Sequence, residues 1–289
     1  MPRTSWSDMV IVQKRVGQLG NQLFAIAHFT AAAIENDYQV LCPCFEFPLD
    51  QFPNINTNPN VKVFRSGCRM NRLVHGFFKF LRLTVPNSPW HRCYLAEGFS
   101  FVNVGSPEFV ADAQKKVVAC EGFGFRDGES VIKHHRLIAE LFRPSRATEV
   151  KVQEFISEKR LDQNVVIVGL HVRRRDYRTY RNGEYYYDDA AWLSWIRQAR
   201  AVFGSNAKPF VGMIFSDEDV SALVNSANDL IRAPGGIYED LCLLAKCHYI
   251  IGPPSTFSGW ASFTGRVPLL HMTKADMQVT PALFQVVNW

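Results

Sequence analysis

Three consecutive arginines follow an unbroken apolar run. The motif His171-Val-Arg-Arg-Arg-Asp-Tyr177 comes after residues 165–170, which read Val-Val-Ile-Val-Gly-Leu. Such a run, rich in β-branched residues, is typical of a strand buried on both faces of a parallel sheet. Ligands of open α/β sheets bind beyond the carboxyl ends of such strands, and guanidinium groups can hold phosphate oxygens bidentately. The pattern therefore predicts a pocket for a diphosphate-bearing substrate.

The arginine cluster has two other interpretations. Under the first, it is a solvated loop whose arginines pair with Asp176 and Glu184. Under the second, it binds RNA, because Arg178, Arg181 and four nearby tyrosines combine basic residues with stacking aromatics. The cluster is confined to one loop at a strand end, however, and no RRM or KH motif accompanies it. A phosphate pocket is the favoured interpretation.

A second polar motif, Ser216-Asp-Glu-Asp219, follows the predicted strand at residues 210–215. Asp217 and Asp219 form a D-x-D pattern, and carboxylate oxygens suit Mg²⁺ or Mn²⁺. Acidic residues are equally favoured at the start of a helix. Because the pattern is short and common, it does not establish a metal site.

Two further motifs place backbone N–H groups at predicted helix starts, where anions are favoured. Gly17-Gln-Leu-Gly-Asn-Gln22 lies between the first strand and its helix, and it matches neither the dinucleotide fingerprint nor a P-loop. Ser255-Thr-Phe-Ser-Gly-Trp260 follows Gly252-Pro-Pro and can begin a helix with Ser255 as its cap. A plain strand-to-helix turn and a plain serine cap explain the same residues.

Composition and the absence of certain motifs narrow the possible classes of protein function. The 289 residues are 47% hydrophobic with a net charge of +5, which is too diffuse a charge to identify a nucleic-acid binder. No apolar run approaches the ~20 residues of a membrane span, and no signal-peptide, G-x-S-x-G or H-E-x-x-H pattern is present. Seven cysteines without a C-x-x-C pair indicate reduced thiols. We expect a cytoplasmic protein, with peripheral attachment to a membrane left open.

Strands and helices are predicted to alternate along the C-terminal half. The pattern indicates strands near residues 165–172, 210–215, 229–232, 248–251 and 267–271, and helices near 188–203, 217–225, 238–247 and 255–264. Alternation of this kind predicts a parallel sheet with right-handed crossovers.

The N-terminal half begins in the same way. It shows strands at residues 9–12, 38–41 and 117–120, and helices at 21–35, 129–142 and 147–159. Residues 43–116 have weak periodicity and are predicted to form an irregular insert. We therefore expect two Rossmann-like domains, residues 1–160 and 161–289, with the first on the acceptor side.

Taken in order, these motifs resemble the α1,2-fucosyltransferases of glycosyltransferase family 11, and more loosely the superfamily that includes α1,6- and protein O-fucosyltransferases. The resemblance spans about residues 9–265, and H-x-R-R-x-D is its most specific element. The similar segments are Gly17–Gln22, Gly122-Phe-Gly-Phe125, His171–Tyr177, Phe215-Ser-Asp-Glu218, Glu239-Asp-Leu-Cys-Leu-Leu-Ala-Lys-Cys247 and Ser255–Trp260.

The resemblance implies an α/β fold of the GT-B type, with two Rossmann-like domains facing each other across a cleft. It implies inverting transfer of L-fucose from GDP-fucose to a glycan hydroxyl, chiefly α1,2 to galactose, with no metal and no other cofactor. Arg173 and Arg174 would hold the diphosphate and stabilise the departing GDP. His171 and Asp217 would help to hold the guanosine.

The remaining site residues implied by the resemblance come from both halves of the chain. Gly20 and Asn21 would approach the β-phosphate or the fucose. Ser255, Thr256 and Phe257 would give hydroxyl and backbone contacts to the nucleotide.

Two features depart from the family pattern. Arg175 stands where relatives usually have glycine, and the last motif has a proline before Ser255 in place of asparagine. The catalytic base is open between Asp176 and Glu184, with Asp176 favoured. Two other functions stay open, namely a metal-dependent D-x-D transferase for another nucleotide sugar and a non-catalytic nucleotide-sugar- or RNA-binding protein. Acceptor and oligomeric state are not predicted.

Overall fold

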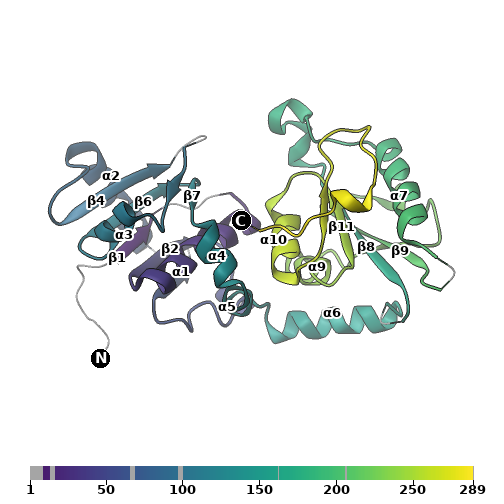
Figure 1. Cartoon of the computed structure of the whole chain (residues 1–289), viewed down its shortest axis with the longest axis horizontal. Coiled ribbons are helices and arrows are strands. Elements are labelled where there is room, and N and C mark those ends of the chain that lie inside the picture. The colour runs from purple at the N-terminus through teal and green to yellow at the C-terminus, as the bar shows by residue number, and fades with distance from the viewer. Residues whose placement is uncertain are drawn as a thin grey trace. The chain divides into compact units, whose positions relative to one another are not determined.

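A parallel five-stranded sheet organises each half of the chain in the computed structural model (Figure 1). The structure describes residues 9–13, 17–65, 69–96, 100–161, 163–205 and 207–288. The chain divides into an N-terminal unit that runs to Ser145 and a C-terminal unit, Arg146–Val287. None of the helices in the described ranges is long and apolar enough to cross a membrane.

The N-terminal unit has the strand order β3-β2-β1-β6-β4, with each neighbouring pair parallel. β1 lies at the centre, where Val10, Ile11 and Val12 are buried, as their apolar character predicts. The short strands β5 and β7 pair with each other beside this sheet. The strands are β1 (Met9–Val12), β2 (Gln39–Phe45), β3 (Val61–Arg65), β4 (His91–Ala96), β5 (Val102–Asn103), β6 (Val117–Gly122) and β7 (Phe125–Arg126).

Helix α1 is the most deeply buried helix of this unit. His28 on α1 is fully buried, and its Nδ1 accepts a hydrogen bond from the Asp127 backbone N–H at 3.0 Å. Burial, with Arg126 nearby, lowers the pKa of His28 to about 3, so the imidazole is neutral. The helices are α1 (Leu19–Asn36), α2 (Arg69–Thr84), α3 (Pro107–Ala113), α4 (Gly128–Lys133) and α5 (His135–Leu141), with a 3₁₀ turn at Leu49–Gln51.

The prediction of an irregular insert over residues 43–116 is wrong. β2 continues to Phe45, and β3 and β4 form the two edges of the main sheet. Along β3, Val61 and Val63 are buried, whereas Lys62 and Phe64 are exposed. This alternation marks a strand with one solvated face. Short edge strands between asparagine- and proline-rich turns leave too few residues for the period to stand out.

The C-terminal unit has the strand order β10-β9-β8-β11-β12, again with parallel neighbours. All five predicted strands are present, with ends shifted by one or two residues. β8 is central, and its Val168, Leu170 and Val172 are completely buried. The strands are β8 (Val166–Val172), β9 (Phe210–Ser216), β10 (Leu230–Arg232), β11 (Tyr249–Gly252) and β12 (Leu269–His271).

Helix α7 covers part of this sheet with the apolar face that its sequence predicts. Trp192, Trp195 and Ile196 are buried in a core that also contains Leu170 of β8. Asp188 caps the helix by accepting a hydrogen bond from the Ala191 N–H at 2.9 Å. The helices are α6 (Arg146–Glu158), α7 (Asp189–Phe203), α8 (Ser221–Val224), α9 (Ile237–Leu244) and α10 (Thr256–Gly265).

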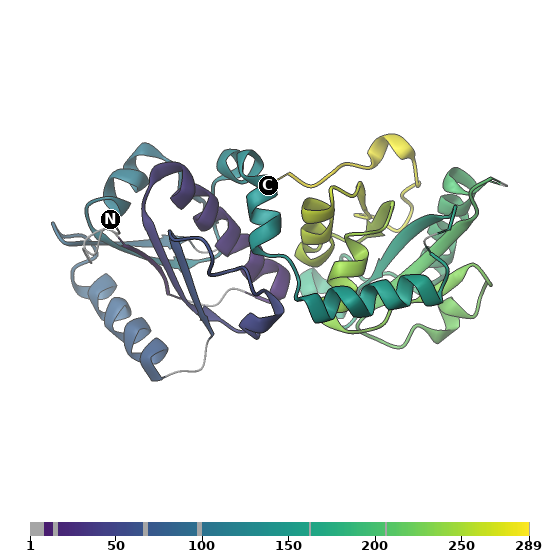
Figure 2. The same cartoon turned by 90° about the horizontal axis from the view of Figure 1, so that it is seen from below.

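The two units divide before α6, whereas the sequence predicts the boundary between the two domains after it, at residue 160. α6 packs against α9 of the C-terminal unit (Figure 2). Lys151 on α6 also donates to Glu239 on α9 at 3.1 Å. The predicted helices at 129–142 and 217–225 differ as well, because the first is interrupted at His134 and the second keeps only α8.

Gly169, in the middle of β8, gives a test of this packing. A Cβ atom there would lie 2.5 Å from Leu244 Cδ1 and 3.0 Å from Cys247 Sγ. Gly169→Ala is therefore expected to lower the free energy of unfolding by about 1–3 kcal/mol, measured by urea denaturation. Gly76→Ala is the matched control, because nothing lies within 4 Å of a Cβ atom at that helical position. Equal stability of Gly169→Ala and the wild type would contradict the packing described here.

Candidate active site

The order of the strands in the C-terminal unit reverses beside β8. The chain passes from β8 through β9 to β10 on one side and then returns to β11 and β12 on the other. Ligands of open α/β sheets bind at such a reversal, outside the carboxyl ends of the strands. Arg173 follows β8 at this point, and Ser255 follows β11 as the cap of α10. Arg173 Nη1 donates to Ser255 Oγ at 3.1 Å, so one hydrogen bond joins the two sides of the reversal.

The guanidinium of Arg173 is fixed by several neighbours. Its Nε and Nη2 donate to the two carboxylate oxygens of Asp176 at 3.0 and 2.6 Å. Its Cζ lies 4.8 Å from the centre of the Tyr177 ring, and the Tyr177 hydroxyl donates to the Pro254 carbonyl. Burial is the largest single effect and lowers the pKa of Arg173, but the hydrogen bonds to Asp176 together with the charges of neighbouring acidic groups outweigh it, so the pKa of Arg173 is raised. The result is a fixed cation at the carboxyl end of β8.

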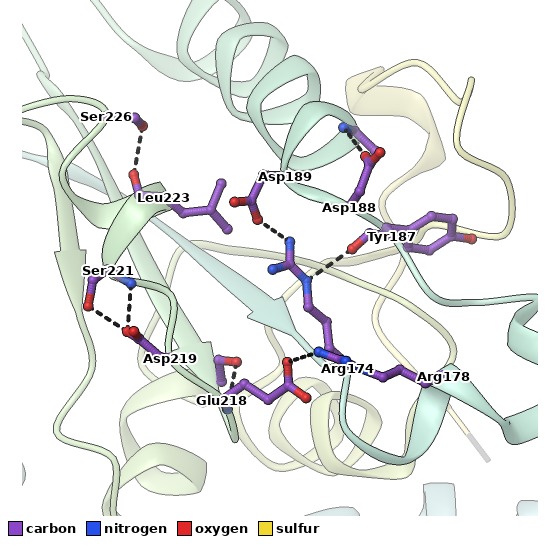
Figure 3. A network of polar contacts seen from close by, with 12 residues as sticks. Arg174, Arg178, Tyr187, Asp188, Asp189, Glu218, Asp219, Ser221, Leu223 and Ser226 are labelled. Atoms are coloured by element: carbon purple, nitrogen blue, oxygen red, sulfur yellow. Dashed lines mark hydrogen bonds and ion pairs between the residues drawn. The ribbon is translucent and has the colours of Figure 1, made fainter.

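Arg174 does not share this position. It is buried, its Nε donates to the Tyr187 carbonyl at 3.0 Å, and its Nη2 donates to Asp189 at the start of α7 (Figure 3). The guanidinium thus links the end of β8 to α7 through protein groups. Sequence reasoning treated Arg173 and Arg174 as equivalent, whereas the structure gives them different surroundings. Arg175 is exposed.

His171, the last but one residue of β8, is buried and faces α10. Its ring centre lies 5.3 Å from that of Phe257, which is half-buried in the first turn of α10. Burial, with Arg173 nearby, lowers the pKa of His171 to about 3, which makes the imidazole neutral at physiological pH. Among the described residues, its buried Nδ1 has no hydrogen-bond partner. His171, Phe257 and Ser255 therefore meet, as the order of the motifs suggests.

The acidic motif after β9 is divided among different partners. Asp219 accepts hydrogen bonds from the backbone N–H and the hydroxyl of Ser221 at the start of α8, and Glu218 pairs with Arg178 (Figure 3). Asp217 is exposed, close enough to Arg173 to raise its pKa further. In the described part of the chain, no group of three His, Cys, Asp or Glu side chains is placed to hold a metal ion. Asp219 thus has a structural role that the D-x-D pattern does not reveal.

The glycine motif of the N-terminal unit starts helix α1. Gly17 has a φ of +59°, a conformation that favours glycine, and a Cβ atom there would lie 2.0 Å from Asn21 Nδ2 and force that side chain to move. Gly20 is buried in the first turn, and Asn21 beside it is half-buried. The Gln22 side chain donates to the Gly17 carbonyl at 3.0 Å, which fixes the turn. Lys14–Val16, which precede this turn, lie outside the described residues.

Three residues that contact the arginine motif do not stand out in the sequence: Tyr177, Asp189 and Pro254. Tyr177 was considered only as a stacking aromatic, and Asp189 only as part of a helix start. Asp189 contacts Arg174 across 15 positions of the chain, and Tyr177 contacts Pro254 across 77 positions. The one signal that could have identified Asp189 is its place at the start of a helix next to a strand that ends in arginines.

Several solved structures are similar to this chain in fold. A mutant of FUT1 from Arabidopsis thaliana, in complex with GDP, has a TM-score of 0.63 at 12% identity, over 96% of this chain and 73% of that chain. Fucosyltransferase NodZ from Bradyrhizobium has a TM-score of 0.59 at 18% identity, over 93% and 95%. POFUT1 in complex with GDP-fucose has a TM-score of 0.52 at 15% identity, over 91% and 95%. No curated protein sequence matches the chain.

A family model gives the assignment. The predicted α/β fold with two Rossmann-like units, the GT-B type, is confirmed by the two parallel sheets and by these structures. The model of glycosyl transferase family 11 matches residues 134–280, just over half of the chain. The matched range contains the arginine motif, the acidic motif and the serine cap of α10. The chain therefore belongs to glycosyl transferase family 11.

Proposed function

We propose that this protein transfers L-fucose from GDP-fucose to a hydroxyl group of a glycan acceptor, with inversion at the anomeric carbon. The observation that carries the proposal is the fixed cation of Arg173 at the reversal of the strand order. The family assignment supports a glycosyltransferase. The likeness to structures solved with GDP and with GDP-fucose supports that donor.

The surroundings of Arg173 suit a nucleoside diphosphate. Ser255 and the first N–H groups of α10 lie next to the guanidinium, and a helix start favours phosphate oxygens. We expect Thr256 to contribute from the same turn. Because the chain holds Arg173 in place through Asp176, little reorganisation is needed when the diphosphate arrives.

Neighbouring side chains can recognise the nucleoside. Asp217 is an exposed carboxylate at the end of β9, suited to accept hydrogen bonds from the amino and imino groups of a guanine base. His171 has a buried, unpartnered Nδ1 among the described residues, and Phe257 packs against its ring. We propose that His171 and Phe257 line the nucleoside pocket.

Arg173 is the proposed catalytic residue. As the bond from fucose to GDP breaks, the sugar gains oxocarbenium character and negative charge accumulates on the leaving diphosphate. A preorganised cation stabilises that charge more in the transition state than in the bound donor, which lowers the barrier. Arg174 supports this arrangement from behind, because its contacts with Tyr187 and Asp189 anchor the end of β8 to α7.

We propose a role for Asp176 other than that of the catalytic base. Its hydrogen bonds with Arg173 hold the pKa of this carboxyl below its usual range, and a carboxylate with a low pKa is a weak base. We propose that Asp176 positions Arg173. Glu184, which is exposed and 3.8 Å from Arg181, stays the other candidate for the base.

The N-terminal unit is proposed to bind the acceptor, and Gly20 and Asn21 to contribute contacts to the β-phosphate or the fucose. The turn at Gly17 supports the contacts proposed for Gly20 and Asn21, because it leads into the N-terminus of α1, where an anion is favoured. The motif order resembles α1,2-fucosyltransferases, so we propose an α1,2 linkage to galactose.

Replacement of Arg173 tests the proposed chemistry. Arg173→Ala is expected to lower kcat for GDP release from GDP-fucose by ~10²–10³-fold, because one preorganised donor of positive charge is lost. Arg173→Lys should recover only part of the rate, since lysine cannot bind bidentately. Arg197→Ala, at an exposed position of α7, is the matched control. A rate for Arg173→Ala close to that of the wild type would exclude the proposed role.

Arg174 is expected to respond differently from Arg173. Arg174→Ala leaves the Tyr187 carbonyl and Asp189 without their partner, so we expect a loss of about 1–3 kcal/mol in unfolding free energy. Calorimetry without GDP-fucose should show a lowered Tm for Arg174→Ala. An unchanged Tm together with weaker binding of GDP-fucose would return Arg174 to the role of a phosphate ligand.

A chelator separates the main proposal from a metal-dependent transferase. Asp219 is engaged with Ser221, which leaves Asp217 as the available carboxylate of the D-x-D pattern. We expect turnover of GDP-fucose to be unchanged in excess EDTA, measured by GDP release with and without a lactose-type acceptor. Loss of activity in EDTA that Mn²⁺ restores would favour the alternative, with Asp217 as a metal ligand.

A further inference from the structure

Helix α2 carries an apolar stripe that faces away from its own unit. Leu73, Phe77, Phe80 and Leu83 are 69%, 57%, 62% and 71% exposed. At 3.6 residues per turn, these four positions fall within an arc of about 120° of the helix circumference. Scattered exposed hydrophobic residues are ordinary, but a contiguous stripe of this kind marks an interaction surface.

The opposite side of α2 packs against the sheet of its own unit. Phe78 is buried in a cluster with Ile11 of β1 and Ala119 of β6, and Leu81 packs against the same cluster. Arg82 is 3.4 Å from Glu121 of β6. α2 lies along the edge of its unit beside β4 (Figures 1 and 2). Phe77 of the stripe touches this core through an edge contact with the Phe78 ring, and most of the surface of the stripe stays outside the core.

Helix α2 lies within a basic segment of the sequence and itself contains four basic residues, Arg69, Arg72, Lys79 and Arg82, and no acidic residue. Residues 51–96 contain seven basic residues and no acidic residue. The other residues then carry 25 basic and 27 acidic groups, a net charge of −2, so this segment accounts for the whole positive charge of the chain. Lys79 borders the apolar arc and is exposed. A basic helix with an exposed apolar face has the composition of helices that lie in the surface of an anionic membrane.

We propose that α2 is an interfacial membrane-binding helix. Leu73, Phe77, Phe80 and Leu83 enter the boundary between headgroups and acyl chains of a bilayer that contains anionic lipid. Lys79, which borders the stripe, contacts the lipid phosphates. This inference is independent of the donor chemistry proposed above.

A second copy of the chain fits this surface less well. A symmetric dimer through the stripe would bring two copies of the same basic segment together, and like charges at an interface oppose association. A neutral glycan would bind aromatic rings without using the excess positive charge. An anionic bilayer matches both the apolar and the charged part of the surface.

Binding of the full chain to lipid vesicles tests the proposal. Cosedimentation is expected with vesicles that contain about a third phosphatidylglycerol, and not with vesicles of phosphatidylcholine alone. Binding should weaken in about 0.5 M NaCl, because salt screens the attraction to the surface. Absence of cosedimentation with the anionic vesicles, or equal binding to both kinds, would overturn the proposal.

Surface variants identify the helix responsible. Phe77→Ser together with Phe80→Ser is expected to lower the partition coefficient at least about tenfold, because two exposed aromatic rings no longer enter the bilayer. Lys79→Glu should lower it at least about fivefold on anionic vesicles. The matched control is Ile132→Ser with Leu137→Ser, two exposed apolar residues of α4 and α5 in the same unit, which should leave binding unchanged.

Three results with these variants would contradict the membrane surface. The first is equal loss of binding in the control pair. The second is a wild-type dimer in analytical ultracentrifugation that Phe77→Ser with Phe80→Ser dissociates, with vesicle binding retained. The third is a higher KM for a soluble glycan acceptor in that variant, with vesicle binding retained. Circular dichroism and GDP-fucose hydrolysis without acceptor verify that each variant is folded.

Discussion

The hydrogen bonds between Arg173 and Asp176 are the interaction on which the candidate site depends. They hold a cation at the reversal of the strand order before any anion is bound. Without Asp176, a long flexible side chain would have to be ordered during binding, at a cost in conformational entropy. The pairing also lets Arg173 Nη1 donate a hydrogen bond to Ser255, so the position of this side chain depends on the distance between the ends of β8 and β11. Arg173 therefore connects the ends of two strands and is also the charged group of the candidate site.

The C-terminal unit follows closely from its sequence. Strands buried on both faces must be apolar along their whole length, and this makes β8 and β9 recognisable without a structure. The site residues stand at the ends of those strands, as the general rule for parallel sheets predicts. Which of the two adjacent arginines pairs across to Ser255 and which is buried against α7 does not follow from sequence. That choice depends on where the chain turns after Val172 and on Asp189, a partner 15 residues away from Arg174.

The structure of the N-terminal unit is harder to predict from its sequence. Its edge strands β3 and β4 are short and solvated on one side, so that their pattern covers too few residues to separate from loops. Pro43 lies within β2, where a sequence rule would end a strand. Helix α2 has a broad apolar face, part of which packs near Ile11 and part of which faces outward, so its sequence does not tell which part reaches the core.

The uneven distribution of charge has a kinetic consequence. A molecule with a positive segment and a slightly negative remainder experiences a torque in the field of an anionic surface. At physiological ionic strength that field extends about 8 Å, so the molecule turns while it is still separated from the surface by a few layers of water. Helix α2, which contains four of the seven basic residues of the segment 51–96, would then face the surface first. Orientation is thus selected during the approach, before any apolar side chain of α2 loses its hydration.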